Sequence, residues 1–184
     1  MTTDLEFQEF PSIKRLSREM VITEKIDGTN AQIIIGEAGE FLTASRKQLI
    51  TPDKDNYGFS TWAHEHKDEL MQLGPGRHFG EWWGEGIQRR YGLKGKHFSL
   101  FNVERYSKNP PPPCCKIVPV LYRGDFCTET VRDVMRELEL KGSVISPGFM
   151  NPEGVVIFHT ASRTLFKKTF EGDEGGKGRN EARQ

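Results

Sequence analysis

The sequence predicts an α+β domain built mainly from antiparallel β-sheets flanked by helices. Many short β-like runs are separated by turn residues, only two segments have helical periodicity, and strands and helices do not alternate as a doubly wound parallel sheet requires. The 184-residue chain is long enough for one domain and too short for two full ones. Its hydrophobic content of 35% and its 12 Phe residues can form a core, which excludes collagen-like, coiled-coil and wholly disordered classes.

The predicted strands are short runs rich in β-branched and aromatic residues and bounded by turn residues. In chain order they cover residues 20–23, 31–35, 41–45, 78–83, 98–103, 117–122, 154–159 and 164–170. The segments Asp27-Gly28-Thr29-Asn30 and Glu37-Ala38-Gly39-Glu40 are typical of tight turns. They predict that the first three strands form an antiparallel meander.

The predicted helices cover residues 59–73 and 129–140, where apolar residues recur at helical spacing. These residues are Phe59, Trp62, Ala63, Leu70 and Leu73 in the first helix and Val131, Val134, Met135 and Leu138 in the second. Gly74-Pro75-Gly76 and Gly142 follow the two segments and are expected to end the helices.

Two segments have the composition of irregular structure. Four prolines at 110–113 cannot donate backbone hydrogen bonds, so this segment is expected to be a loop. Residues 171–184 are rich in Gly and charge and contain one small apolar residue, Ala182, so we expect a mobile tail. The domain is therefore expected to cover residues 1–170, with no additional C-terminal domain.

The charges and the cysteines indicate the class of partner and the compartment. The 26 Lys and Arg balance the 26 Asp and Glu, so contact with a nucleic acid would need a local basic patch. The candidate cations for such a patch are Arg77, Arg89, Arg90, Lys94 and Lys96. No apolar run reaches membrane-spanning length and no signal peptide pattern begins the chain, which predicts no membrane partner. The odd count of 3 Cys favours reduced thiols in the cytoplasm, or in the host cytoplasm for a viral protein.

The segment Glu24-Lys25-Ile26-Asp27-Gly28-Thr29-Asn30 places a lysine at the end of a β-like run, directly before an Asp-Gly turn. A lysine attacks phosphorus only in its neutral form, which burial and neighbouring cations favour. A lysine held at a rigid junction between a strand and a turn inside a pocket would suit that task. The alternative is a surface lysine beside an ordinary hairpin, because a Lys-x-Asp-Gly pattern alone has little specificity.

Further polar and aromatic residues lie at or near the ends of later predicted strands. They are Arg46, Glu81, Phe98, Phe101, Glu153, Lys167 and Lys168. Phe98 and Phe101 alternate to opposite faces of a strand, so only one ring could enter a given pocket, and adjacent Lys167 and Lys168 also diverge. Taken singly, each of these residues is as well explained by a solvated surface or by core packing.

The ordered combination of these segments, over residues 10–168, resembles the covalent nucleotidyltransferases, which are DNA ligases, RNA ligases and mRNA capping enzymes. The sequence of the Glu24–Asn30 motif, followed by Ser45-Arg46, looks most like that of the ATP-dependent RNA ligases of the bacteriophage strand-repair and RNA-editing branch. Capping enzymes and DNA ligases more often carry Arg near the position of Asn30. The resemblance implies the ligase adenylation-domain fold.

The resemblance also implies a role for each residue. Lys25 would attack the α-phosphorus of ATP and hold AMP, and Glu153 would hold the catalytic Mg²⁺ or Mn²⁺. The Glu24 and Ile26 backbones would read adenine, and Phe101 would stack on it. Asn30 would lie near the phosphate, Arg46 would bind ribose and phosphate, and Glu81 the ribose hydroxyls. Lys167 and Lys168 would contact phosphates, although the family's last motif has two lysines separated by one residue; Thr169 could take the second place.

These implications predict an ATP-dependent polynucleotide ligase that joins 5′-phosphate and 3′-hydroxyl ends, with RNA as the favoured substrate. We expect a monomer that could act with a separate end-binding protein. The alternatives are DNA nick sealing or GMP transfer on the same fold, or a non-catalytic RNA-end-binding protein.

Overall fold

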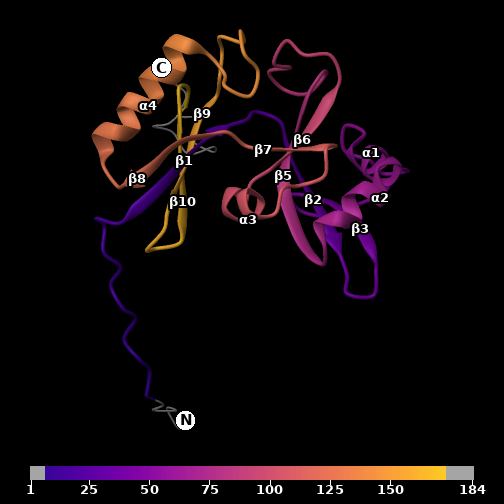
Figure 1. The fold of residues 1–184 in the computed structure, drawn as a ribbon, viewed down its shortest axis with the longest axis horizontal. Helices are drawn as coiled ribbons and strands as arrows, with labels where there is room; N and C mark the ends of the chain where they lie inside the picture. Colours follow the sequence, from indigo (N-terminus) through magenta and orange to yellow (C-terminus); the bar gives the residue numbers. More distant parts are fainter. Residues whose placement is uncertain (1–6, 173–184) are drawn as a thin grey trace, which may run out of the picture.

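The computed structural model describes residues 7–172, which form two β-sheets with helices on their outer sides (Figure 1). The four-stranded sheet has the order β10-β9-β1-β8, and the six-stranded sheet has the order β4-β3-β2-β5-β6-β7. The strands are β1 (Glu19–Lys25), β2 (Thr29–Ile35), β3 (Phe41–Ser45), β4 (Leu49–Ile50), β5 (Gly76–Gly84), β6 (Lys96–Leu100), β7 (Cys115–Ile117), β8 (Val120–Asp125), β9 (Gly154–His159) and β10 (Thr164–Thr169). All pairings are antiparallel except β6 with β7.

The helices other than the one that follows β6 lie on the sheet faces that point away from each other. Helix α4 (Thr128–Lys141) packs on the four-stranded sheet, whereas α1 (Phe59–Glu65) and α2 (Lys67–Leu70) lie beside the six-stranded sheet, and α3 (Val103–Lys108) follows β6 (Figure 1). The short 3₁₀ helix η1 (Met71–Leu73) directly follows α2. This arrangement leaves the inner face of each sheet turned toward the other sheet.

The alternation of side chains along two strands explains this layering. In β1, Met20 and Ile22 are buried against α4, so the intervening Val21, Thr23 and Lys25 point to the opposite face. In β2, residues Ala31, Ile33 and Ile35 are buried against α1 and α2, so Asn30 and Gln32 point to the inner face. Polar residues of both strands therefore meet between the sheets.

The predicted meander of the first three strands is wrong. β1 pairs with β8 and β9, whereas β2 pairs with β3 and β5, so residues 26–28 cross from one sheet to the other. Gly28 does not form a hairpin turn; it lets the backbone of the crossing lie close to the backbone of β5. A Cβ on Gly28 would lie 2.4 Å from the Trp82 carbonyl oxygen, so only glycine lets this crossing pass so near β5.

Several other boundaries differ from those predicted. The expected helix over residues 59–73 is divided into α1, α2 and η1, because the backbone leaves helical geometry at His66. The strand expected over 98–103 ends at Leu100, and Asn102 caps the unpredicted α3 by accepting a hydrogen bond from the Arg105 N–H. The strand expected over 117–122 is divided between the two sheets as β7 and β8.

The expectations for the second helix and for the proline segment are confirmed. Helix α4 agrees with the predicted second helix within two residues and ends at Gly142, and the prolines at 110–113 lie in a loop. Among residues 7–172 the three cysteines are free, and no helix is long and apolar enough to cross a bilayer. Most of the predicted tail, residues 173–184, lies outside the described residues.

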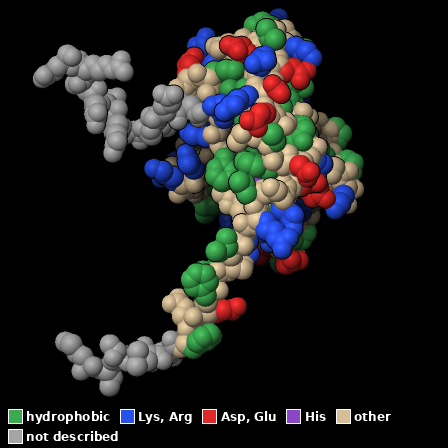
Figure 2. Space-filling model, turned by 90° about the vertical axis from the view of Figure 1, so that its left-hand side faces the viewer, with side chains coloured by type: hydrophobic (Ala, Val, Ile, Leu, Met, Phe, Trp, Pro, Cys, Tyr) green, Lys and Arg blue, Asp and Glu red, His purple; other side chains and the backbone are tan. Residues whose placement is uncertain are grey.

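Figure 2 shows the face on the side of α4, where charges of both signs are interspersed. The segment before β1 extends from this body and exposes Phe7, Phe10 and Ile13 (Figure 2). In this view, residues 7–172 form no extended patch of one charge sign that would attract a polyanion over a long range.

Candidate active site

A cavity of about 880 Å³ lies between the inner faces of the two sheets. The four-stranded sheet contributes Lys25, Val156, Phe158 and Leu165, and the six-stranded sheet contributes Asn30, Gln32, Phe79 and Glu81. Arg46, which follows β3, and Phe101, which follows β6, also line it. The structure thus brings together residues that the sequence placed on separate predicted strands.

Lys25 and Glu153 form an ion pair at one end of the two middle strands of the four-stranded sheet. The Lys25 Nζ donates to Glu153 Oε2 at 2.5 Å, although the residues are 128 positions apart in the chain. The pairing of Lys25 with Gly154 across β1 and β9 brings them together, because Glu153 directly precedes β9. Both side chains are partly shielded from solvent. The Lys25 ammonium is therefore held in place by direct contact with a carboxylate.

The crossing after Lys25 is fixed by hydrogen bonds to distant residues. The Asp27 N–H donates to Tyr91 Oη at 2.7 Å, and Arg89 Nε donates to Asp27 Oδ2 at 3.1 Å. Arg89 also donates to the Asn151 side chain at 2.7 Å. These contacts tie the Lys25 turn to the loop before Glu153, so the two ends of the ion pair are positioned by one network.

Glu81 lies opposite Asn30 across β2 and β5, on the other wall of the cavity. The Asn30 amide donates to Glu81 Oε2 at 2.9 Å, and the Gly28 N–H donates to Oε1 at 3.1 Å. Only 7% of Glu81 is exposed, and this burial raises its pKa to about 7 despite the two donors. The carboxyl group therefore gains or loses its proton close to neutral pH.

This raised pKa predicts a pH-dependent stability. Between pH 4.5 and 7 the folded protein keeps the Glu81 proton that the unfolded chain has lost, so the free energy of unfolding falls as pH rises. The full cost of ionising the buried group is about 3 kcal/mol. Chemical denaturation should therefore show that Glu81→Gln gains up to about 3 kcal/mol relative to the wild type between pH 5 and pH 8. An equal difference between the two proteins at both pH values would contradict the raised pKa.

The structure separates the two phenylalanines that the sequence left as alternatives. Phe98 is fully buried in the core with α1, whereas Phe101 is 42% exposed and lines the cavity. Glu24 and Ile26 also line the cavity. The Glu24 N–H donates to the Pro119 carbonyl at 3.0 Å, so this donor is already engaged. The Glu24 side chain is engaged as well, because it accepts hydrogen bonds from the backbone N–H groups of residues 144 and 145.

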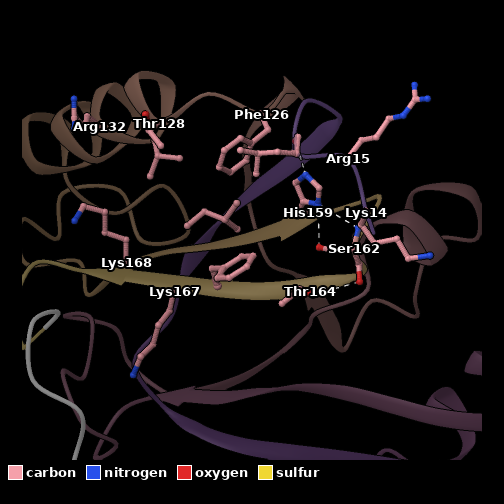
Figure 3. A pocket seen from close by; sticks show the side chains of 14 residues that line it. Lys14, Arg15, Phe126, Thr128, Arg132, His159, Ser162, Thr164, Lys167 and Lys168 are labelled. Atoms are coloured by element: carbon pink, nitrogen blue, oxygen red, sulfur yellow. Dashed lines mark hydrogen bonds between the residues drawn. The ribbon is translucent and has the colours of Figure 1, made fainter. Parts of the chain in front are cut away.

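Lys167 and Lys168 lie on opposite sides of β10. Lys167 pairs with Val156, which lines the cavity, whereas Lys168 pairs with Val155, which is buried against α4. Figure 3 shows the two side chains pointing apart beside a second cavity of about 560 Å³ under α4. The structure thus places Lys168 away from the other predicted site residues, because neighbouring side chains of a strand alternate. Thr169 follows Lys167 on its face of β10 and donates to the Glu171 carbonyl.

Several contributors to the site were missed in the sequence. Tyr91, Asn151 and Gln32 belong to the network or line the cavity, and nothing in their sequence context distinguishes them from other polar residues. The predicted basic patch is also changed. Arg89 is engaged with Asp27, and Arg77 lines the cavity, so these two are not part of one open surface with the remaining cations.

The residues of this site fit a divalent cation that is bound mainly by a substrate and by water, with one carboxylate of the protein. Residues 7–172 contain no group of three or more His, Cys, Asp or Glu that could bind a metal alone. Mg²⁺ commonly binds one or two carboxylates together with substrate phosphates and waters. Glu153, which contacts the cavity-lining Lys25, is a carboxylate that could hold such an ion.

Comparisons with known proteins identify relatives of the whole described fold. The family model described as RNA ligase matches residues 18–169. No curated protein matches the chain. Solved structures of a Naegleria gruberi RNA ligase share the fold, and they include an apo variant with TM-score 0.61, 20% identity, and coverage of 88% of this chain and 52% of that chain.

Two further structures of that ligase contain ligands. A variant with AMP and Mn has TM-score 0.63 and 19% identity over 89% of this chain and 53% of that chain. A variant with ATP and Mn has TM-score 0.61 and 20% identity over 82% of this chain and 48% of that chain. The chain therefore spans about half the length of these structures, and the likeness confirms the predicted α+β ligase fold.

Proposed function

This chain belongs to the RNA ligase family, and from this premise we propose that it is an ATP-dependent RNA ligase that acts through a covalent lysyl-AMP intermediate. The observation that carries the proposal is the Lys25–Glu153 pair, which faces Glu81, Asn30 and Arg46 across one cavity. A nucleophile held by an adjacent carboxylate, with donors for a nucleotide, is the arrangement that nucleotidyl transfer requires.

In the first step, Lys25 gives up a proton to water and its neutral Nζ attacks the α-phosphorus of ATP. The bond from this phosphorus to pyrophosphate breaks as the N–P bond of lysyl-AMP forms. In the second step, an oxygen of an RNA 5′-phosphate attacks the same phosphorus, the N–P bond breaks, and Lys25 regains a proton. In the third step, a 3′-hydroxyl attacks the activated 5′-phosphorus and gives up its proton to water, while the bond from this phosphorus to AMP breaks and AMP leaves.

The other residues bind and orient the nucleotide. Arg46 and Lys167 offset phosphate charge, Glu81 accepts hydrogen bonds from the ribose, and Phe101 presents a partly exposed ring for stacking on adenine. The Ile26 backbone and the remaining polar groups of Glu24 are the candidates for reading the adenine edge. Mg²⁺ or Mn²⁺ held by Glu153 would neutralise charge on the phosphates when bound.

Incubation with α-labelled ATP and a divalent metal, followed by a denaturing gel, tests this proposal. The expected result is an acid-labile label on the protein, with ATP strongly preferred over GTP. Label from GTP alone would favour a capping-type transferase, and no label from either nucleotide would favour a non-catalytic RNA-end-binding protein. Pre-adenylated nicks in all-RNA and all-DNA duplexes then distinguish RNA from DNA ligation.

Separate substitutions of the two neighbouring lysines should have unequal effects on labelling. Lys167→Ala should slow adenylate formation by about 10–100-fold, because it removes a charge-assisted contact to phosphate. Lys168→Ala should change the rate less than about threefold once the folded fractions are matched, because this side chain lies on the α4 side of β10. Rapid-quench measurement of label incorporation gives both rates, and equal losses would contradict the assignment.

The cellular location, the oligomeric state and the partners of the enzyme are also proposals. The free cysteines favour a cytoplasmic location, and we expect a monomer that binds RNA ends. A separate end-binding protein that supplies further contacts to RNA is part of the same proposal.

A further inference from the structure

Gln32 is a buried polar residue in the wall of the active-site cavity. It lies in the middle of β2, where it pairs with Ala44 of β3 and Phe79 of β5. Only 9% of the residue is exposed, and it lines the cavity between the sheets. The side chain lies on the same face of β2 as Asn30, which contacts Glu81.

The amide nitrogen of this side chain has no hydrogen-bond partner. Among the buried side-chain nitrogen and oxygen atoms of residues 7–172, Gln32 Nε2 is the one without a hydrogen-bond partner. Buried side-chain donors are nearly always satisfied in folded proteins, because an unmade hydrogen bond destabilises the fold. A leucine at this position would fill similar volume without that cost, so the amide is best explained by a ligand that it contacts.

The surrounding groups indicate which ligand atom the amide meets. The neighbouring Asn30 Nδ2 is itself a donor, which it gives to Glu81, so it supplies no acceptor for the Gln32 amide. Arg46 lies two residues after Ala44, just beyond the end of β3, and it lines the same cavity as Gln32, so this wall combines a guanidinium with an N–H donor. A cation and a neutral donor side by side match the oxygens of a phosphate.

We propose that Gln32 donates a hydrogen bond from Nε2 to a phosphate oxygen of the ligand held in this cavity. The proposal rests on the proposed function for the identity of that ligand. The phosphate belongs either to the nucleotide or to the 5′ end of the RNA, and these two sources share the same chemistry. Gln32 is therefore a binding residue that discriminates phosphorylated from unphosphorylated ligands.

Binding measurements without turnover test this assignment. The probes are AMP, adenosine, and a short oligoribonucleotide with either a 5′-phosphate or a 5′-hydroxyl, titrated into wild type, Gln32→Leu and Gln32→Glu. Gln32→Leu should weaken binding of the phosphorylated ligand by about 10–100-fold and leave binding of its unphosphorylated counterpart unchanged. Gln32→Glu should weaken it further, because a carboxylate repels phosphate. The pair of ligands that responds, AMP with adenosine or the two RNAs, identifies the source.

Stability separates this binding role from a structural one. Gln32→Leu should unfold at the same denaturant concentration as the wild type or a higher one, because it removes a buried donor that lacks a partner. Gln48→Leu, at an exposed glutamine outside the cavity, is the matched control and should change neither stability nor binding. Lower stability of Gln32→Leu, unchanged binding of every phosphorylated probe, or an equal loss for adenosine and AMP would overturn the proposal. Since no probe requires catalysis, absence of lysyl-AMP in the wild type would count against the proposed function alone.

Discussion

Lys25→Arg should reduce lysyl-AMP formation by at least about 10⁴-fold, although it keeps the positive charge. A guanidinium stays protonated in proteins and has no lone pair with which to attack phosphorus. Arginine can still form an ion pair with Glu153, so the substitution removes the nucleophile with little effect on the surrounding network. Label incorporation from α-labelled ATP, with the folded fraction checked by chemical denaturation, measures the effect.

Two further variants define what this result means. Lys25→Ala should give the same loss of label, and it leaves Glu153 without the ammonium that it contacts at 2.5 Å. Lys54→Arg makes the same chemical change at an exposed lysine outside the cavity and should keep the wild-type rate. Label retained by Lys25→Ala would place the covalent bond on another residue and remove the basis of the proposed function.

The positions of the strands could be predicted because each is a short apolar run, but their partners could not. Asp27-Gly28 has the chemistry of a hairpin turn, and local sequence cannot show that Gly28 instead passes against the backbone of β5. The same limit applies to the strand expected over 117–122, whose two halves belong to different sheets. Pairing between distant strands depends on the packing of the whole core rather than on any one segment.

The candidate site could be predicted in part for similar reasons. The motif around Lys25 and the carboxylate of Glu153 were visible, and alternation predicted that Lys167 and Lys168 diverge. Which lysine faces the cavity depends on the register of β10 with β9, which no local pattern determines. Gln32 lies next to a run of isoleucines, and only the three-dimensional structure shows that its amide lacks a partner.

The close approach at Gly28 leads to a second large expected effect. A methyl group at this position would lie 2.4 Å from the Trp82 carbonyl oxygen and 2.8 Å from the Trp83 Cβ. Neither atom can move freely, because the first is backbone and both tryptophans are buried. Gly28→Ala should therefore lower the free energy of unfolding by about 1–3 kcal/mol. It should also slow lysyl-AMP formation by at least about 10²-fold, since the displaced turn holds Lys25 and donates to Glu81.

The matched control is Gly36→Ala, which makes the same change in the turn between β2 and β3. Its added methyl group would meet the carboxylate end of Glu40, a flexible side chain that can rotate away. We expect Gly36→Ala to stay within about 1 kcal/mol of the wild type in stability and to label normally. Equal behaviour of the two variants would mean that the crossing at Gly28 has room to relax. A loss of labelling by Gly28→Ala, measured where both proteins are fully folded, would show that this contact between β2 and β5 positions the nucleophile.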